Sequence, residues 1–159
     1  MSKENFAVLS VCPLFNGLSK KQIFYITAFF KQALFSKGAI VMQEGQKVDQ
    51  LYIVSHGKWE VFLPKDNQDI PREQEVRLGM LECGALIGEY SFIDEYFASA
   101  SVRTLEKGGL LMINRPDFER ILESSNQVGK IIYKNLLLGL ISRLRKQNEE
   151  KELLNLFDF

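Results

Sequence analysis

Glycine recurs at short, near-regular intervals from Gln32 to Ile113 and divides this stretch into brief apolar runs. The runs are rich in Val, Ile, Leu and Phe, as short β-strands are. Many short strands joined by glycine turns are typical of a β-barrel or a β-sandwich. The polar segment 64–75 has a proline near each end and is expected to form an exposed hairpin loop. We expect strands at 33–35, 40–42, 50–55, 59–63, 76–80, 98–105 and 109–114.

Helices are expected on both sides of this β region. Ser19 is suited to cap a helix over 20–31, where apolar residues recur at helical spacing. Pro116 and Asp117 suit the first turn of a second helix. A long helix follows over 127–151, and its apolar side chains cover about half of its circumference, whereas packing on one core needs a stripe of about 100°. We therefore predict that this helix packs on its own domain and on a second surface.

Length and charge limit what the chain can be. Its 159 residues, 46% of them hydrophobic, suffice for one core. Twenty basic and twenty acidic residues give no net charge, which argues against electrostatic binding of nucleic acid or a membrane surface. No signal-like start or membrane-length apolar run is present, so we expect a soluble, cytoplasmic protein.

The same reasoning divides the chain into four parts. We expect an N-terminal extension over 1–11, a barrel with flanking helices over 12–126, a dimerisation helix over 127–151 and an apolar tail over 152–159. The tail is a candidate surface for a protein partner, because chain ends are usually polar. Its apolar residues are Leu153, Leu154, Leu156, Phe157 and Phe159.

Three groups of residues, in this order, carry a resemblance to a known family. The first two are Leu14-Phe15-x-x-Leu18-Ser19 and Gln43-Glu44-Gly45-x-x-Val48-Asp49-x-Leu51-Tyr52-Ile53-Val54-x-x-Gly57. The third is Leu81-x-x-Gly84-x-x-Ile87-Gly88-Glu89. Together they resemble the cyclic-nucleotide-binding domains over about 12–147. The resemblance implies a mainly β fold with flanking helices, namely a jelly-roll barrel (double-stranded β-helix) with an N-terminal helix and a long C-terminal helix.

The resemblance also implies a binding cassette for cyclic AMP or cyclic GMP. Gly88 allows the backbone to approach a ligand, and N–H groups near Glu89 to Ser91 would point into the site if a short helix begins there. Glu89 matches the family position that accepts a hydrogen bond from the ribose hydroxyl. Glu89 could instead be structural, accepting backbone hydrogen bonds within the cassette. The candidate binding residues are Gly88, Glu89, Tyr90, Ser91, Ala98, Ser99 and Ala100.

The cassette departs from the family at Phe97-Ala98, where the family usually has Pro-Arg. Loss of a charge-assisted arginine–phosphate pair costs roughly 1.5–3 kcal/mol, or about ten- to a hundredfold in affinity. Arg103 is an odd number of residues from Ala98, so in a strand it should point to the opposite face. Tyr90, Tyr96 and Phe97 are large enough to fill a vacated pocket, or they pack ordinarily beneath the loop.

These features predict a non-catalytic signalling module, a homodimer through helix 127–151, with a degenerate phosphate-binding cassette and nucleotide binding weakened, altered or lost. One alternative is a protein–protein interaction scaffold that uses the C-terminal helix and tail. A second is a functional cyclic-nucleotide sensor with a non-standard phosphate site. We do not expect an enzyme or a metal site, because His56 has no assignable nucleophile and Cys12 and Cys83 lack metal-ligand spacing.

Overall fold

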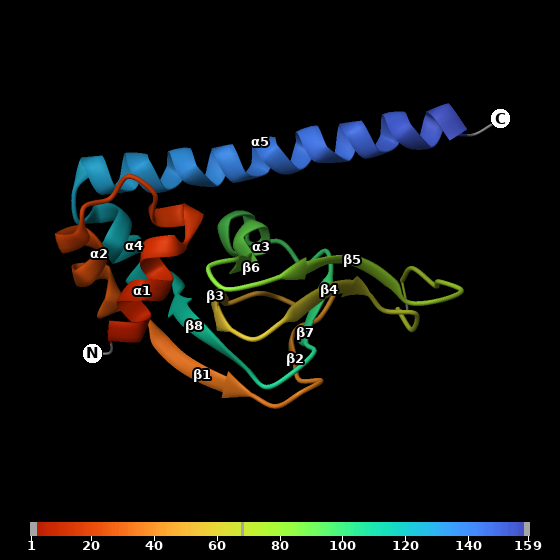
Figure 1. Cartoon of the computed structure of the whole chain (residues 1–159), viewed down its shortest axis with the longest axis horizontal. Coiled ribbons are helices and arrows are strands. Elements are labelled where there is room, and N and C mark those ends of the chain that lie inside the picture. Colours follow the sequence, from red (N-terminus) through yellow and green to blue (C-terminus); the bar gives the residue numbers. More distant parts are fainter. Residues whose placement is uncertain (1–2, 68, 158–159) are drawn as a thin grey trace.

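In the part of the chain that the structure describes, eight strands form two four-stranded antiparallel sheets, ordered β1-β8-β3-β6 and β2-β7-β4-β5 (Figure 1). The computed structural model describes residues 3–67 and 69–157, with side chains as far as Glu152. The strands are β1 (Lys31–Phe35), β2 (Ile40–Met42), β3 (Gln50–His56), β4 (Trp59–Leu63), β5 (Val76–Leu81), β6 (Leu86–Ile87), β7 (Ser101–Thr104) and β8 (Gly108–Asn114). The helices are α1 (Lys3–Val11), the 3₁₀ turn η1 (Pro13–Phe15), α2 (Lys20–Thr27), α3 (Glu89–Asp94), α4 (Arg115–Glu123) and α5 (Asn126–Phe157).

The barrel core lies between the two sheets. Val54 and Leu110 come from the first sheet, and Trp59 and Val102 come from the second. Trp59 is fully buried, and its indole N–H donates to the His56 carbonyl oxygen at 3.1 Å. The predicted jelly-roll barrel with flanking helices is therefore confirmed.

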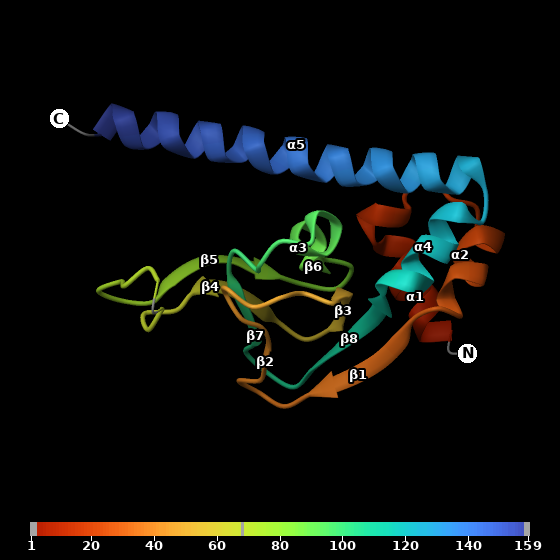
Figure 2. The ribbon, with the colours of Figure 1, turned by 180° about the vertical axis from the view of Figure 1, so that it is seen from behind.

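The helices α1, α2 and α4 lie at one end of the barrel (Figures 1 and 2), and a second cluster of buried side chains joins them to it. Helix α1 contributes to this cluster through its buried residues Val8 and Leu9. The cluster also contains Phe118 and Ile121 of α4 and Ile132 of α5. Much of the N-terminal extension is thus part of the folded domain.

Most predicted elements are present with small changes at their ends. The Ser19 cap is confirmed, because its side chain and that of Gln22 form a reciprocal capping box. The helix after Ser19 ends at Thr27, not residue 31, because β1 begins at Lys31. Two short elements were not predicted as such: the two-residue strand β6 and the turn η1. Both are too short for a periodic pattern.

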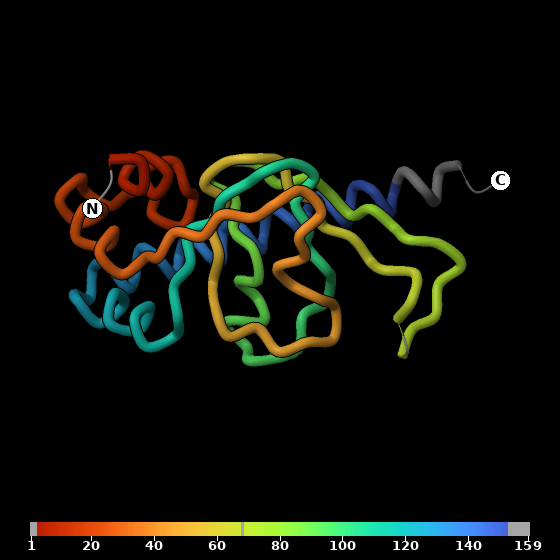
Figure 3. Tube along the Cα trace, turned by 90° about the horizontal axis from the view of Figure 1, so that it is seen from below, coloured from red at the N-terminus to blue at the C-terminus, as the bar shows by residue number. Residues whose placement is uncertain are grey.

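Segment 64–75 links β4 to β5 and projects beneath the far half of α5 (Figures 1 and 3). Most of its described residues are exposed, as predicted, but one of its side chains is anchored to the domain. The Arg72 guanidinium donates to both carboxylate oxygens of Glu44, at 2.8 and 2.9 Å, and these side chains are 15% and 8% exposed. This pair joins the hairpin loop to the turn that follows β2.

Helix α5 runs along one side of the whole molecule (Figures 1 and 2). Its buried residues Val128 and Ile132 pack on the second cluster. Tyr133, Leu137, Leu140, Ile141 and Leu144 are between 39% and 59% exposed. At 100° per residue these five form a stripe about 100° wide beside the buried face. The backbone of α5 continues to Phe157, whereas the side chains of Leu153, Leu154, Leu156 and Phe157, and all of Phe159, lie outside the described residues.

The outer face of the second sheet carries a charge cluster around Glu60. The Glu60 side chain is 2% exposed, and its carboxylate accepts hydrogen bonds from Arg77 and, at 2.9 Å, from Arg103 Nε. Arg103 also pairs with Glu75, and its guanidinium lies 4.1 Å from the centroid of the Phe62 ring. Burial opposes ionisation of Glu60, but the two arginines outweigh it and hold its pKa below the usual range.

Glu60 should therefore make the fold sensitive to acid. Because its pKa is lowered in the folded state, its contribution is present above the unfolded pKa of about 4.3 and is lost as pH falls through the folded value. We expect Glu60→Gln to lower the free energy of unfolding by about 1–2 kcal/mol at neutral pH, and the difference to shrink on acidification. Urea unfolding from pH 7 to about pH 3.5 measures this. Glu75→Gln, at a carboxylate that is 41% exposed, is the control, and an equal pH dependence in both variants would contradict the prediction.

Candidate functional site

The candidate cassette begins where β6 ends and α3 starts. Gly88 has φ 79°, in the left-handed region that favours glycine. A Cβ at this position would lie 3.0 Å from the Val48 side chain and 3.3 Å from the Met42 sulfur. The Gly88 carbonyl oxygen accepts the Phe92 N–H at 2.9 Å and closes the first turn of α3. Glycine is therefore required here both for backbone conformation and for close packing.

Glu89 is the first residue of α3, and its side chain is only 9% exposed. One carboxylate oxygen, Oε1, lies 2.5 Å from Arg143 Nη2 of α5. The Arg143 guanidinium also lies over the Tyr90 ring, 4.9 Å from its centroid. Arg143 was not among the predicted site residues. A signal was present, because Arg143 follows the buried Ile132 by three helical turns and so falls on the same side of α5.

The far end of α3 is fixed by residues that sequence reasoning also missed. Arg115, at the start of α4, donates to the Phe92 carbonyl oxygen and lies 4.7 Å from the centroid of the Phe92 ring. The Phe92 ring packs edge-on against Phe118 at 5.5 Å. The chain then turns through Glu95, which has φ 60°. The Ser91 hydroxyl donates to the Phe97 carbonyl oxygen at 3.2 Å and ties the helix to the returning chain.

Ala98 lies on this returning chain beside the turn after β2. Its N–H donates to the Gln46 carbonyl oxygen, and its carbonyl oxygen accepts the Gly45 N–H, each at 2.8 Å. Ala98 and Ala100 are buried, whereas Ser99 is exposed. The predicted strand over 98–105 is wrong at its start, because β7 begins at Ser101. Residues 98–100 instead pair locally with the turn at 45–46.

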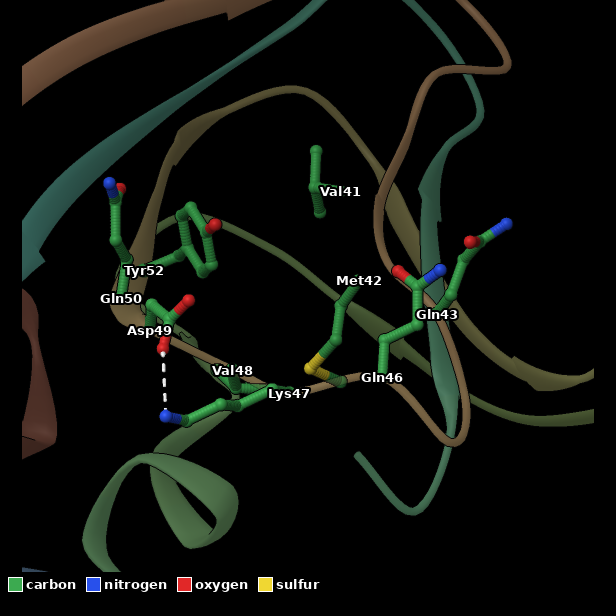
Figure 4. A pocket seen from close by; sticks show the side chains of 9 residues that line it. All are labelled: Val41, Met42, Gln43, Gln46, Lys47, Val48, Asp49, Gln50 and Tyr52. Atoms are coloured by element: carbon green, nitrogen blue, oxygen red, sulfur yellow. Dashed lines mark ion pairs between the residues drawn. The ribbon is translucent and has the colours of Figure 1, made fainter. Parts of the chain in front are cut away.

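A cavity of about 260 Å³ lies beside the cassette (Figure 4). Met42, Val48 and Gln50 line it, and these residues also surround the space that a Cβ on Gly88 would enter. Its polar lining comes from Gln43, Gln46, Lys47, Asp49, Gln50 and Tyr52. The cavity is therefore bounded by the segment 41–52, and Gly88 packs against two of its lining side chains, Met42 and Val48.

The three aromatic residues proposed to fill a vacated pocket do not line this cavity. Tyr90, Tyr96 and Phe97 are 37%, 71% and 57% exposed. Tyr96 and Phe97 pack against each other, with ring centroids 5.8 Å apart. These side chains leave the cavity open.

The structure places Glu89, Tyr90 and Ser91 on α3 and Gly88 directly before it. Ala98, Ser99 and Ala100 lie on the returning chain after Phe97, whose carbonyl oxygen accepts the Ser91 hydroxyl. Arg103 is held elsewhere, by Glu60 and Glu75 on the outer face of the second sheet. Its orientation agrees with the opposite-face prediction.

Comparisons with known proteins identify the family. The profile described as cyclic nucleotide-binding domain matches residues 32–125, which include both sheets and the cassette. The chain belongs to this family. It is 30% identical to the cyclic AMP receptor protein of Thermus thermophilus over 143 residues, covering 90% of this chain and 62% of that protein. It is 31% identical to the potassium channel SKOR of Arabidopsis thaliana over 142 residues, covering 89% of this chain and 16% of the channel.

A solved structure agrees with the sequence comparisons. The catabolite activator protein of Thermus thermophilus superposes with a TM-score of 0.76 at 30% identity, covering 90% of this chain and 63% of that one. The chain thus spans less than two thirds of the length of these relatives. Among residues 3–67 and 69–157, no helix is both long and apolar enough to cross a membrane.

Proposed function

We propose that this chain is a non-catalytic regulatory module whose cassette binds cyclic nucleotide with reduced affinity. The observation that supports the proposal is Ala98, which occupies the position where the family usually has arginine. Gly88 precedes α3, Glu89 begins it, and the Ser91 hydroxyl of the same helix contacts Phe97, the residue before Ala98. Arg103 is committed to two carboxylates, so it does not replace the missing arginine.

We also propose that α5 is the helix that responds when the cassette binds a ligand. Arg143 joins α5 directly to Glu89, the carboxylate expected to accept the ribose hydroxyl. A nucleotide that uses Glu89 would therefore compete with Arg143 for the same oxygen atoms. The position of α5 would then depend on whether the cassette is occupied.

We propose that two copies pair through the exposed apolar stripe of α5, defined by Tyr133, Leu137, Leu140, Ile141 and Leu144. Its position beside the buried face supports a second packing surface. The relative whose name is cyclic AMP receptor protein, and whose solved structure shares this fold, is consistent with a module that responds to a nucleotide.

Calorimetric titration with cyclic AMP and with cyclic GMP tests the reduced affinity. We expect weak binding, because the lost arginine–phosphate pair contributes about ten- to a hundredfold in affinity. Micromolar or tighter binding of either nucleotide by the unmodified protein would contradict the proposal. The interaction scaffold remains the second candidate, and it is favoured by the exposed apolar stripe if no nucleotide binds.

A further inference from the structure

We propose that Arg72, in the hairpin loop between β4 and β5, is a positioning residue for the candidate cassette. It acts through Glu44, which lies in the turn after β2 (residues 43–47) and joins that turn to the hairpin loop. This inference rests on the proposed function, because the turn is bonded to Ala98, the position where the family usually has arginine. It adds a residue outside the cassette that fixes where position 98 lies.

The turn after β2 is bonded to the returning chain through the backbone. The Gly45 N–H donates to the Ala98 carbonyl oxygen, and the Ala98 N–H donates to the Gln46 carbonyl oxygen, each at 2.8 Å. An antiparallel bridge between Lys47 and Phe97 extends this pairing. Strand β7 begins only three residues after Ala98. Position 98 therefore takes its place from the turn and not from the ladder of either sheet.

Glu44 anchors this turn on two sides. Its backbone N–H donates to the Ser101 hydroxyl at 2.9 Å, and Ser101, the first residue of β7, is 2% exposed. Its carboxylate oxygens accept hydrogen bonds from the two terminal nitrogens of Arg72, at 2.8 and 2.9 Å. One residue thus links the turn to β7 through its main chain and to the hairpin loop through its side chain.

The arginine that holds Glu44 is itself fixed within the loop. Arg72 Nη1 also donates to the Pro64 carbonyl oxygen at 3.2 Å. The hydrogen bond from Arg72 holds the pKa of Glu44 below its usual range, and Asn67 of the same loop adds to this effect. Two parallel hydrogen bonds between largely buried partners define one geometry, unlike an exposed ion pair. A change at Arg72 should therefore be transmitted to the turn.

Hollow space lies beside this pair. A cavity of about 460 Å³ is lined both by the turn, with Gln46, and by the loop, with Asp66 and Asp69. Unfilled space supplies few van der Waals contacts, so packing across it does little to hold the two segments together. The position of the turn should for this reason depend strongly on the pair of Arg72 and Glu44.

Hydrogen exchange of single amides in the full chain, followed by NMR, tests the positioning. Arg72→Gln removes the charge and the two parallel hydrogen bonds. We expect the amides of Gly45 and Ala98 to exchange about tenfold faster, because a charge-assisted pair contributes at least that factor to local stability. The Phe92 amide, whose bond to Gly88 closes α3, should exchange at an unchanged rate. Arg72→Lys keeps the charge and should give a smaller increase at the same two amides.

Arg77→Gln is the matched control, because Arg77 also donates to a buried carboxylate, that of Glu60 on the outer face of the second sheet. In this variant Gly45 and Ala98 should exchange as in the unmodified chain. Unchanged exchange at both amides in Arg72→Gln, or an equal acceleration throughout the chain, would overturn the inference. So would the same local acceleration in Arg77→Gln. If Arg72→Gln does not fold, the comparison rests on Arg72→Lys.

Calorimetric titration with cyclic AMP and cyclic GMP then connects positioning with binding. Ala98→Arg is the reference, because an arginine at 98 binds phosphate only if the backbone presents it correctly. Adding Arg72→Gln to this variant should weaken binding about three- to tenfold, through lost pre-organisation. An unchanged affinity would overturn the inference. Failure of Ala98→Arg itself to bind either nucleotide would contradict the proposed function, and the exchange rates would still decide whether Arg72 positions residue 98.

Discussion

Replacing Ala98 with arginine is expected to tighten cyclic-nucleotide binding about ten- to a hundredfold. The substitution adds a guanidinium at the position where the family usually has arginine, next to the proposed cassette residues of α3. The gain corresponds to roughly 1.5–3 kcal/mol, the usual value of a charge-assisted hydrogen-bonded pair. Calorimetry with cyclic AMP and cyclic GMP, on the variant and on the unmodified chain, measures it.

Two further variants separate charge from size at this buried position. Ala98→Gln has a similar polar side chain without the charge, and it should gain little affinity. Ala98→Lys is a shorter cation for the case in which arginine disturbs the fold, which circular dichroism would reveal. Folded Ala98→Arg and Ala98→Lys variants that bind no better than Ala98→Gln would show that the missing charge is not what limits binding.

Placing two acidic residues in the exposed stripe of α5 is expected to convert a dimer to a monomer. Leu137 and Leu144 are 59% and 50% exposed, and both should be buried when two helices pair. Burying an unpaired carboxylate in an apolar interface costs several kcal/mol, enough to shift a micromolar dimer to monomer. Light scattering coupled to gel filtration of Leu137→Glu/Leu144→Glu and of the unmodified chain gives the masses.

Ser142→Glu is the control for this experiment, because Ser142 is exposed on a different side of α5 from Leu137 and Leu144. It should remain dimeric. A monomeric unmodified chain at tens of micromolar, which is roughly the concentration these measurements use, would contradict pairing through α5. An unchanged dimer in the double variant would place the interface elsewhere.

Features set by neighbouring residues could be predicted from the sequence. Ser19 and Gln22 form their cap because a capping box needs only residues three apart. Residues 40–42 and 59–63 were assigned as strands with the same ends as β2 and β4, because apolar runs between turns carry a clear pattern. The packing of one side of α5 on its own domain followed from helical periodicity, whereas the second packing surface stays a prediction, because the apolar stripe beside the buried face is exposed. Gly88 was placed at the start of a short helix by resemblance, and its left-handed φ accounts for the glycine.

Other features depend on residues that are distant in the sequence. The helix α1 lay in a stretch without a strong pattern, and its burial comes from packing against α2 and the barrel. The start of β7 was misjudged, because Ala98 pairs with Gln46 rather than with the strand ladder. The contact of Arg143 with Glu89 requires α5 to pass over α3. No local pattern reports that arrangement.

The sequence by itself determined the family, the glycine-bounded barrel and the absence of arginine at position 98, because each is written in residue types at fixed spacing. Only the tertiary structure decided which carboxylates pair with the arginines. It holds Arg103 on Glu60 and sets Arg143 on Glu89. The physical reason is that electrostatic interactions depend on distance and burial in space, and chain folding sets both.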